Sequence, residues 1–92
     1  MEFLGKACHV VQGQYSNGRI ALRIVSLSGE PLATATINMP EVGGMKPDYV
    51  IIKDYSENEG MLDWLVSNRV VTRPIEWVTG ADRRKHPVCA VV

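Results

Sequence analysis

Four carboxylates gather near the middle of the chain, and their types and spacing are the first to suggest chemistry. Paired carboxylates can move protons or bind a divalent cation. No basic residue lies among them, no histidine is near, and their spacing is not that of a calcium-binding loop. We therefore interpret the cluster first as structural and solvated charge, second as a partner-binding surface, and last as a catalytic site. The four residues are Asp54, Glu57, Glu59 and Asp63.

Two cysteines and two histidines form the next candidate group, because zinc accepts thiolate and imidazole ligands. Cys8 and His9 are adjacent on an expected strand, so their side chains point to opposite faces. The spacing of His86 and Cys89 encloses a proline and has no second standard pair. We predict two small buried thiols, two surface histidines, and no metal or other cofactor. A cysteine–histidine nucleophile is disfavoured, because no third group is marked to orient it.

A basic stretch, Arg83-Arg84-Lys85-His86, lies near the C-terminus. It can contact phosphate or an acidic protein surface, or it can be a solvated hairpin tip. The two tryptophans are further candidates, because tryptophan is enriched at binding hot spots, although in a domain with only six aromatic residues a tryptophan is more often part of the core. On a helical wheel Trp64 lies opposite part of an apolar stripe. We therefore expect Trp64 to be more exposed than Trp77.

The elements that position these residues predict an α+β domain. We expect a mostly antiparallel β-sheet, a meander plus C-terminal strands, with one α-helix packed on one face. Alternating apolar and polar residues between turn residues predict the strands, and an apolar stripe at helical spacing predicts one helix. Asn17-Gly18 favours a type I′ hairpin turn, and the unbroken apolar centre of the fourth strand predicts burial on both faces. The predicted strands cover residues 3–14, 19–27, 32–38, 49–54, 70–72, 75–78 and 87–92, and the helix covers 57–68.

The start of the helix carries a capping signal. Ser56 and Glu59 fit the Ser-x-x-Glu capping box, in which each side chain bonds the other residue's amide. Gly60 is interpreted as a position of close helix–sheet approach. These assignments leave Asp54, Glu57 and Asp63 free to face a partner.

Composition bounds the class of protein. The chain has 92 residues, 46% of them hydrophobic and 22% charged, which is typical of one soluble domain spanning residues 1–92. Ten bases balance ten acids, which argues against nucleic-acid binding driven by bulk charge. The charge is segregated: residues 54–68 hold four acids and no base (−4), and residues 69–92 hold five bases and two acids (+3). No apolar run reaches the ~20 residues of a membrane span, and no signal peptide is evident, so we expect a cytoplasmic protein without membrane contact.

One segment resembles a known family signature. Residues 51–60, IIKDYSENEG, resemble the motif FIKDYSENEG of a family of small uncharacterised proteins from phages, plasmids and conjugative elements. Residues 17–22, 29–36 and 87–89 are similar to that family's hairpin, third strand and closing strand. The chain has Ile51 where the family often has phenylalanine, and Arg83-Arg84-Lys85 is not part of the pattern.

The resemblance implies a mobile-element setting and no enzymatic activity. Small accessory proteins of such elements often bind and inhibit host defence systems. We therefore expect a non-enzymatic inhibitor of a host protein or ribonucleoprotein complex, of anti-CRISPR type, in the host cytoplasm. Asp54, Glu57, Asp63, Arg83, Arg84 and Lys85 are the expected contact residues. The alternative is a small nucleic-acid-binding or regulatory protein that uses the basic tip, and an enzyme ranks last.

Overall fold

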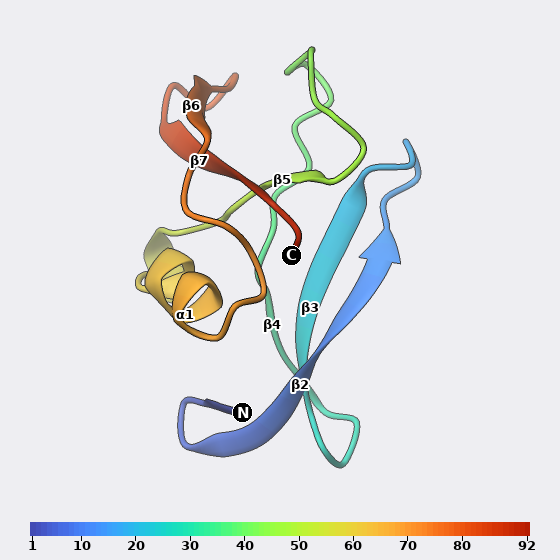
Figure 1. The fold of residues 1–92 in the computed structure, drawn as a ribbon, viewed down its shortest axis with the longest axis vertical. Coiled ribbons are helices and arrows are strands. Elements are labelled where there is room, and N and C mark those ends of the chain that lie inside the picture. Colours follow the sequence, from blue (N-terminus) through green and yellow to red (C-terminus); the bar gives the residue numbers. More distant parts are fainter.

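The computed structural model describes residues 1–92 as an α+β fold with two antiparallel sheets and one α-helix (Figure 1). The predicted fold class is confirmed, although the strands divide between two sheets. The first sheet has the order β1-β2-β3-β4, and the second has the order β5-β7-β6. The strands are β1 (Glu2–Phe3), β2 (Lys6–Gln14), β3 (Ile20–Ser26), β4 (Pro31–Thr34), β5 (Tyr49–Ile51), β6 (Glu76–Thr79) and β7 (Lys85–Ala90).

The long β2–β3 hairpin follows the expected alternation. Leu22 and Ile24 are buried while Arg23 between them is exposed, because successive side chains of a strand point to opposite faces. The hairpin at Asn17-Gly18 is confirmed, but its predicted turn type is wrong. Gly18 has a φ of 84° whereas Asn17 is not in the left-handed region. The Asn17 side chain instead accepts a hydrogen bond from the Arg19 amide at 3.2 Å, so the turn needs only one residue with positive φ.

The two sheets are joined through the chain that follows β4. Thr36 forms an isolated antiparallel bridge with Ile52. The Ile37 amide donates to the Ile51 carbonyl at 3.0 Å, and the Lys53 amide donates to the Ala35 carbonyl at 2.9 Å. The outer side of β5 is therefore paired, and the meander continues into the second sheet.

The helical segment between β5 and β6 is broken, and the predicted capping box is wrong. A 3-10 turn, η1 (Ser56–Asn58), precedes the α-helix α1 (Met61–Ser67), and neither has a cap from its own N-cap side chain. Gly60 separates them with a φ of 91°. The Asp54 carboxylate accepts the Leu62 amide at 2.9 Å and so satisfies an amide in the first turn of α1.

Two apolar clusters hold the fold together. The larger joins both sheets to α1 through its buried Met61 and Leu65. The smaller contains Met39, Ile51 and Val88. Val50 and Ile52 belong to the first cluster and Ile51 to the second, which confirms that this strand region is buried on both faces. No helix of the structure is both long enough and apolar enough to span a membrane.

Candidate functional site

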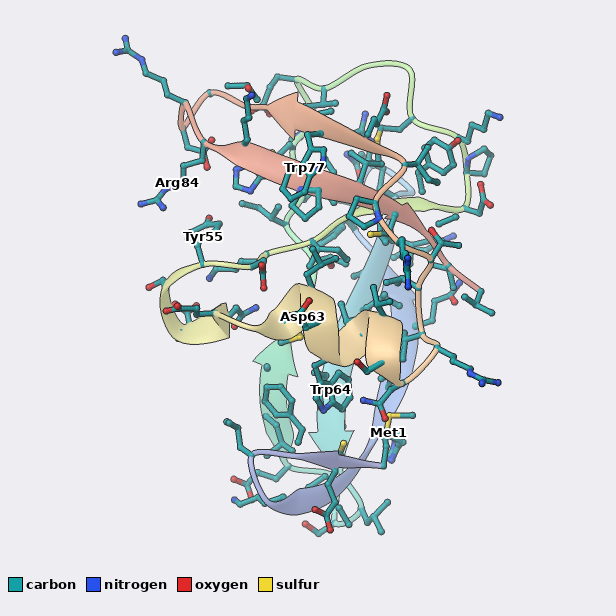
Figure 2. The ribbon with its side chains drawn as sticks, turned by 60° about the vertical axis from the view of Figure 1, so that its left-hand side comes forward. Met1, Tyr55, Asp63, Trp64, Trp77 and Arg84 are labelled. Carbon is teal, nitrogen blue, oxygen red and sulfur yellow. The ribbon has the colours of Figure 1, made fainter.

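A shallow groove connects the acidic segment to the basic tip. It has a volume of about 100 Å³ and lies between the end of the β5 segment and the β6–β7 hairpin. Two parts of the chain that are far apart in sequence thus meet on one surface (Figure 2). The lining residues are Asp54, Tyr55, Trp77, Arg84, Lys85, His86 and Pro87.

The Tyr55 ring organises one end of this groove. The guanidinium carbon of Arg84 lies 4.6 Å from the ring centroid, and Figure 2 shows Arg84 directed from the hairpin tip toward Tyr55. The Lys53 ammonium lies 5.7 Å from the same centroid, and the His86 ring centre lies 5.4 Å away. Cations over an aromatic face are attracted by its quadrupole, so Arg84 is oriented by Tyr55 while remaining exposed.

The hairpin tip is a fixed turn rather than an unstructured basic run. The Asp82 carboxylate accepts the Arg84 amide at 3.1 Å, and its other oxygen lies 2.8 Å from Nε2 of His86. The Arg84 amide, with a smaller contribution from His86, holds the pKa of Asp82 below its ordinary value. Arg83 adopts a φ of 62° in this turn and does not line the groove. The tip therefore presents Arg84 and Lys85 to the groove.

Trp77 forms the apolar side of the groove. Its residue surface is 56% exposed, and it lies opposite Pro87 on β7. Trp64 is half-buried and therefore less exposed than Trp77, and its indole N–H donates to the Glu2 carbonyl at 2.8 Å. The prediction that Trp64 would be the more exposed tryptophan is therefore wrong. A helical wheel considers the residues of one helix alone, so it takes no account of Phe3. The Phe3 ring packs edge-on against Trp64, with ring centroids 5.2 Å apart.

The three carboxylates expected on one surface lie in different places. Asp54 lines the groove and caps α1. Glu57 is paired with Lys53 and lines a separate hollow of about 170 Å³ beside Phe3 and Trp64. Asp63 is exposed on α1 (Figure 2). Of the three carboxylates, only Asp54 lines the same groove as Arg84 and Lys85.

The cysteine and histidine residues are mostly enclosed. Cys8 and Cys89 are free, buried thiols, as predicted. Burial raises the pKa of the Cys89 thiol to about 11, so the thiolate that would act as a nucleophile is disfavoured. The prediction of a surface histidine at 86 is wrong, because His86 is 1% exposed and bonded to Asp82. No group of three or more His, Cys, Asp or Glu residues in the structure is arranged to hold a metal ion.

The charge of the groove is mixed. Asp54 lines the groove together with Arg84 and Lys85, and Asp82 lies next to it, bonded to the Arg84 amide and to His86. A phosphate channel would be dominated by bases, whereas protein interfaces combine tryptophan, tyrosine and arginine with a polar rim. Sequence reasoning missed Tyr55 as a member of this site, and it placed His86 in the basic stretch without its bond to Asp82. The pattern Asp82-x-Arg84-x-His86 could have indicated that these three residues interact, since a turn can bring such residues together.

Comparisons with protein-family models, curated proteins and solved structures found no match to this chain. The motif-level resemblance of residues 51–60 therefore remains a prediction.

Proposed function

We propose that this protein is a non-enzymatic binding protein that attaches stoichiometrically to a host protein or ribonucleoprotein and inhibits it. The observation that carries the proposal is the exposed Trp77 beside the Tyr55–Arg84 pair. Tryptophan, tyrosine and arginine are the residues most enriched at binding hot spots. Here Asp82 holds the backbone of the turn at Arg84, and the Tyr55 ring orients the Arg84 guanidinium, so Arg84 loses less side-chain freedom on binding.

The proposed target class follows from the resemblance of residues 51–60 to mobile-element proteins. A CRISPR effector is the proposed complex, and inhibition by an anti-CRISPR mechanism is the proposed outcome. Arg84 and Lys85 are suited to carboxylates of a protein subunit, since charge-assisted pairs of this kind are strong and directional. Asp54 at the same groove is suited to a cation that otherwise holds nucleic acid.

A tagged protein purified from a host that carries the defence complex tests this proposal. The wild-type protein is expected to recover a defined complex at fixed stoichiometry and to inhibit target cleavage when the purified components are mixed. The double variant Trp77→Ala, Arg84→Glu is expected to lose both properties. Arg23→Glu is the matched control, because Arg23 is exposed on β3 in the other sheet. Failure of the wild-type protein to bind or inhibit any effector of its host would contradict the proposal.

Direct nucleic-acid binding is the second candidate, favoured by the proximity of Trp77 to Arg84 and Lys85. Bases stack on exposed aromatic rings in single-strand binding proteins. The acidic neighbours Asp54 and Asp82 weaken this candidate. A titration of Trp77 fluorescence with single-stranded DNA and RNA at low salt distinguishes the two, using Trp64→Phe to remove the other indole. Saturable quenching that Arg84→Glu abolishes would favour nucleic acid, and an unchanged signal would remove this candidate.

A further inference from the structure

A hollow between α1 and the N-terminal hairpin, here called the α1 hollow, lies away from the groove. Its volume is about 170 Å³, below the roughly 300–1,000 Å³ of sites that enclose a whole small molecule. Figure 2 shows Trp64 on the side of α1 that faces the N-terminal hairpin. The α1 hollow shares no lining residue with the groove. Its lining residues are Phe3, Leu4, Glu57, Asn58, Glu59, Gly60, Met61 and Trp64.

Two aromatic rings form a corner of the α1 hollow. The planes of the Phe3 and Trp64 rings stand at 85° to one another. The Trp64 indole N–H is already used, since it donates to the Glu2 carbonyl. The rings therefore offer the hollow π-surface and no free N–H donor. Such a surface attracts cations, and tryptophan attracts them most strongly.

Two carboxylates belong to the same hollow, and no basic residue lines it. Glu57 is paired with Lys53 through Oε1, so its second carboxylate oxygen remains available. Glu59 is exposed and belongs to none of the three ion pairs of the structure. The charge at the hollow is therefore net negative, even when Lys53 is counted with its partner.

Asn58 adds an uncharged acceptor to the hollow. The residue is 4% exposed, and its Nδ2 donates to the Thr34 carbonyl at 2.6 Å. Its Oδ1 accepts no hydrogen bond, yet no fully enclosed side-chain polar atom lacks a partner. The Oδ1 atom therefore reaches the surface. Asn58 lines only the α1 hollow and one neighbouring hollow, so this largely buried amide presents an open acceptor there.

Leu4 stands at the rim of the α1 hollow in a conformation that leucine disfavours. It adopts a φ of 51° in the turn between β1 and β2, and it is 85% exposed. Bulky residues rarely occupy this left-handed region. Neither the backbone conformation nor burial explains a leucine at this position. An apolar contact with a bound side chain does, since Leu4 lines both the α1 hollow and its neighbour.

We propose that the α1 hollow binds an arginine side chain of a partner protein. A guanidinium has five N–H donors and no acceptor, which matches the acceptors of Glu57, Asn58 and Glu59. Its plane stacks on aromatic rings, and it is more weakly hydrated than an ammonium, so arginine is favoured over lysine. The Phe3–Trp64 corner supplies the rings, and the carboxylates supply the opposite charge.

A protein partner, rather than a free small molecule, fits the size and surroundings of the site. The α1 hollow holds about one side chain, and the neighbouring hollow of about 360 Å³ shares four of its lining residues. The residues that flank the arginine in the partner chain can therefore lie over this neighbour, against Leu32 and Ala33. The inference does not rest on the proposed function, because the groove has a separate set of lining residues.

Titration of the isotope-labelled whole protein with the peptide acetyl-Gly-Arg-Gly-amide, followed by NMR, tests the site. The indole N–H signal of Trp64 is expected to shift saturably, while that of Trp77 stays unchanged. The same peptide with citrulline in place of arginine keeps the shape but loses the charge. It is expected to bind roughly tenfold more weakly or less. No saturable shift of the Trp64 signal, or equal binding of the citrulline peptide, would overturn the proposal.

Three variants connect the binding to the hollow itself. Glu59→Gln removes a carboxylate that no ion pair uses, and is expected to weaken binding of the arginine peptide roughly tenfold. Asp63→Asn is the matched control and is expected to bind like the wild type, because Asp63 is exposed on α1 but does not line the hollow. Leu4→Asn suits the left-handed conformation, so it should keep the stability of the fold and weaken binding severalfold. Equal losses in Glu59→Gln and Asp63→Asn would overturn the proposal, because they would assign binding to the general charge of α1.

Discussion

The two tryptophans of this protein show how one residue type serves two purposes. Trp64 has its indole N–H bonded to the Glu2 carbonyl and its ring packed edge-on against Phe3. It ties α1 to the N-terminal hairpin. Trp77 is 56% exposed and stands beside a fixed arginine–tyrosine pair. The first tryptophan completes the fold, whereas the second leaves a large apolar surface open in a site that the fold holds rigid.

The contacts of a tryptophan therefore indicate its role better than its place in the sequence pattern does. Trp64 lies opposite part of its helix's apolar stripe, yet a segment from the other end of the chain covers it. Trp77 alternates in an ordinary strand, yet its strand is at the edge of the sheet.

Trp64→Ala is expected to destabilise the fold by about 3 kcal/mol, near the low end for tryptophan truncation because the side chain is only half-buried. Both the contact with Phe3 and the bond to the Glu2 carbonyl are lost. The free energy of unfolding in urea measures this effect. Trp64→Phe keeps an aromatic ring against Phe3 but loses the indole N–H. Its free energy of unfolding should fall between those of the wild type and Trp64→Ala. A Trp64→Ala protein as stable as wild type would end the assignment of Trp64 to the fold.

Trp77→Ala is expected to show the reverse behaviour. Its unfolding free energy should change by no more than about 0.5 kcal/mol, as is usual for exposed positions. Binding to the target should weaken by about 2 kcal/mol or more, as for a hot-spot residue. Urea unfolding and a binding titration with the recovered target give the two values. Unchanged affinity would remove Trp77 from the contact surface, and the assignment of Trp77 to binding would be wrong.

Asp54→Ala is expected to cost about 1 kcal/mol of stability, the usual value for losing a side-chain cap. The Asp54 carboxylate satisfies the Leu62 amide at the start of α1. Ser56→Ala and Glu59→Gln are the matched controls, because the predicted capping box assigned this role to them. Urea unfolding should rank Asp54→Ala as clearly less stable than both controls. An equal loss in the Ser56→Ala protein would restore a capping role for that serine.

The strands of this fold were predictable because alternation and turn residues act locally. The buried strand around Ile51 and the hairpin at Asn17-Gly18 required only neighbours in sequence. The helix start was not predictable in this way. Ser56 has a φ of 56°, which takes it out of the N-cap conformation, and the cap comes from Asp54 instead.

Gly60 illustrates the same limit. The sequence predicts close helix–sheet approach at this position, but a side-chain carbon there would meet no atom of another segment within 4 Å. Its φ of 91° shows that the chain needs glycine for backbone conformation. The groove was even less accessible to prediction, since it depends on Arg84 reaching Tyr55 across the gap between two elements. Sequence indicated the basic tip and the acidic segment separately, and only the tertiary fold joined Asp54 to that tip.

Glu57 forms an ion pair with Lys53 outside the groove, and its contribution to stability is expected to be small. The hydrogen bond from Lys53 lowers the pKa of Glu57 from 4.5 to about 2. A carboxyl group with a depressed pKa in the folded state stabilises the fold fully above its unfolded pKa, and this contribution is lost as the pH falls through the folded pKa. Stability should therefore decrease between pH 4.5 and about 2. The Glu57 side chain is 64% exposed, so solvent screening keeps this contribution small.

Urea midpoints measured across this pH range for wild type, Glu57→Gln and Lys53→Met isolate the contribution. Both variants should lose less stability than wild type as the pH falls. At the acidic end of the range, all three proteins should have nearly equal urea midpoints. The Trp77→Ala protein should retain the wild-type decline, because Trp77 contacts neither member of the pair. A wild-type decline that survives in Glu57→Gln would assign the acid sensitivity to another group, for which Asp82 is the first candidate. Its pKa is also lowered, chiefly by the Arg84 amide, and its protonation would loosen the turn that fixes the groove beside Trp77.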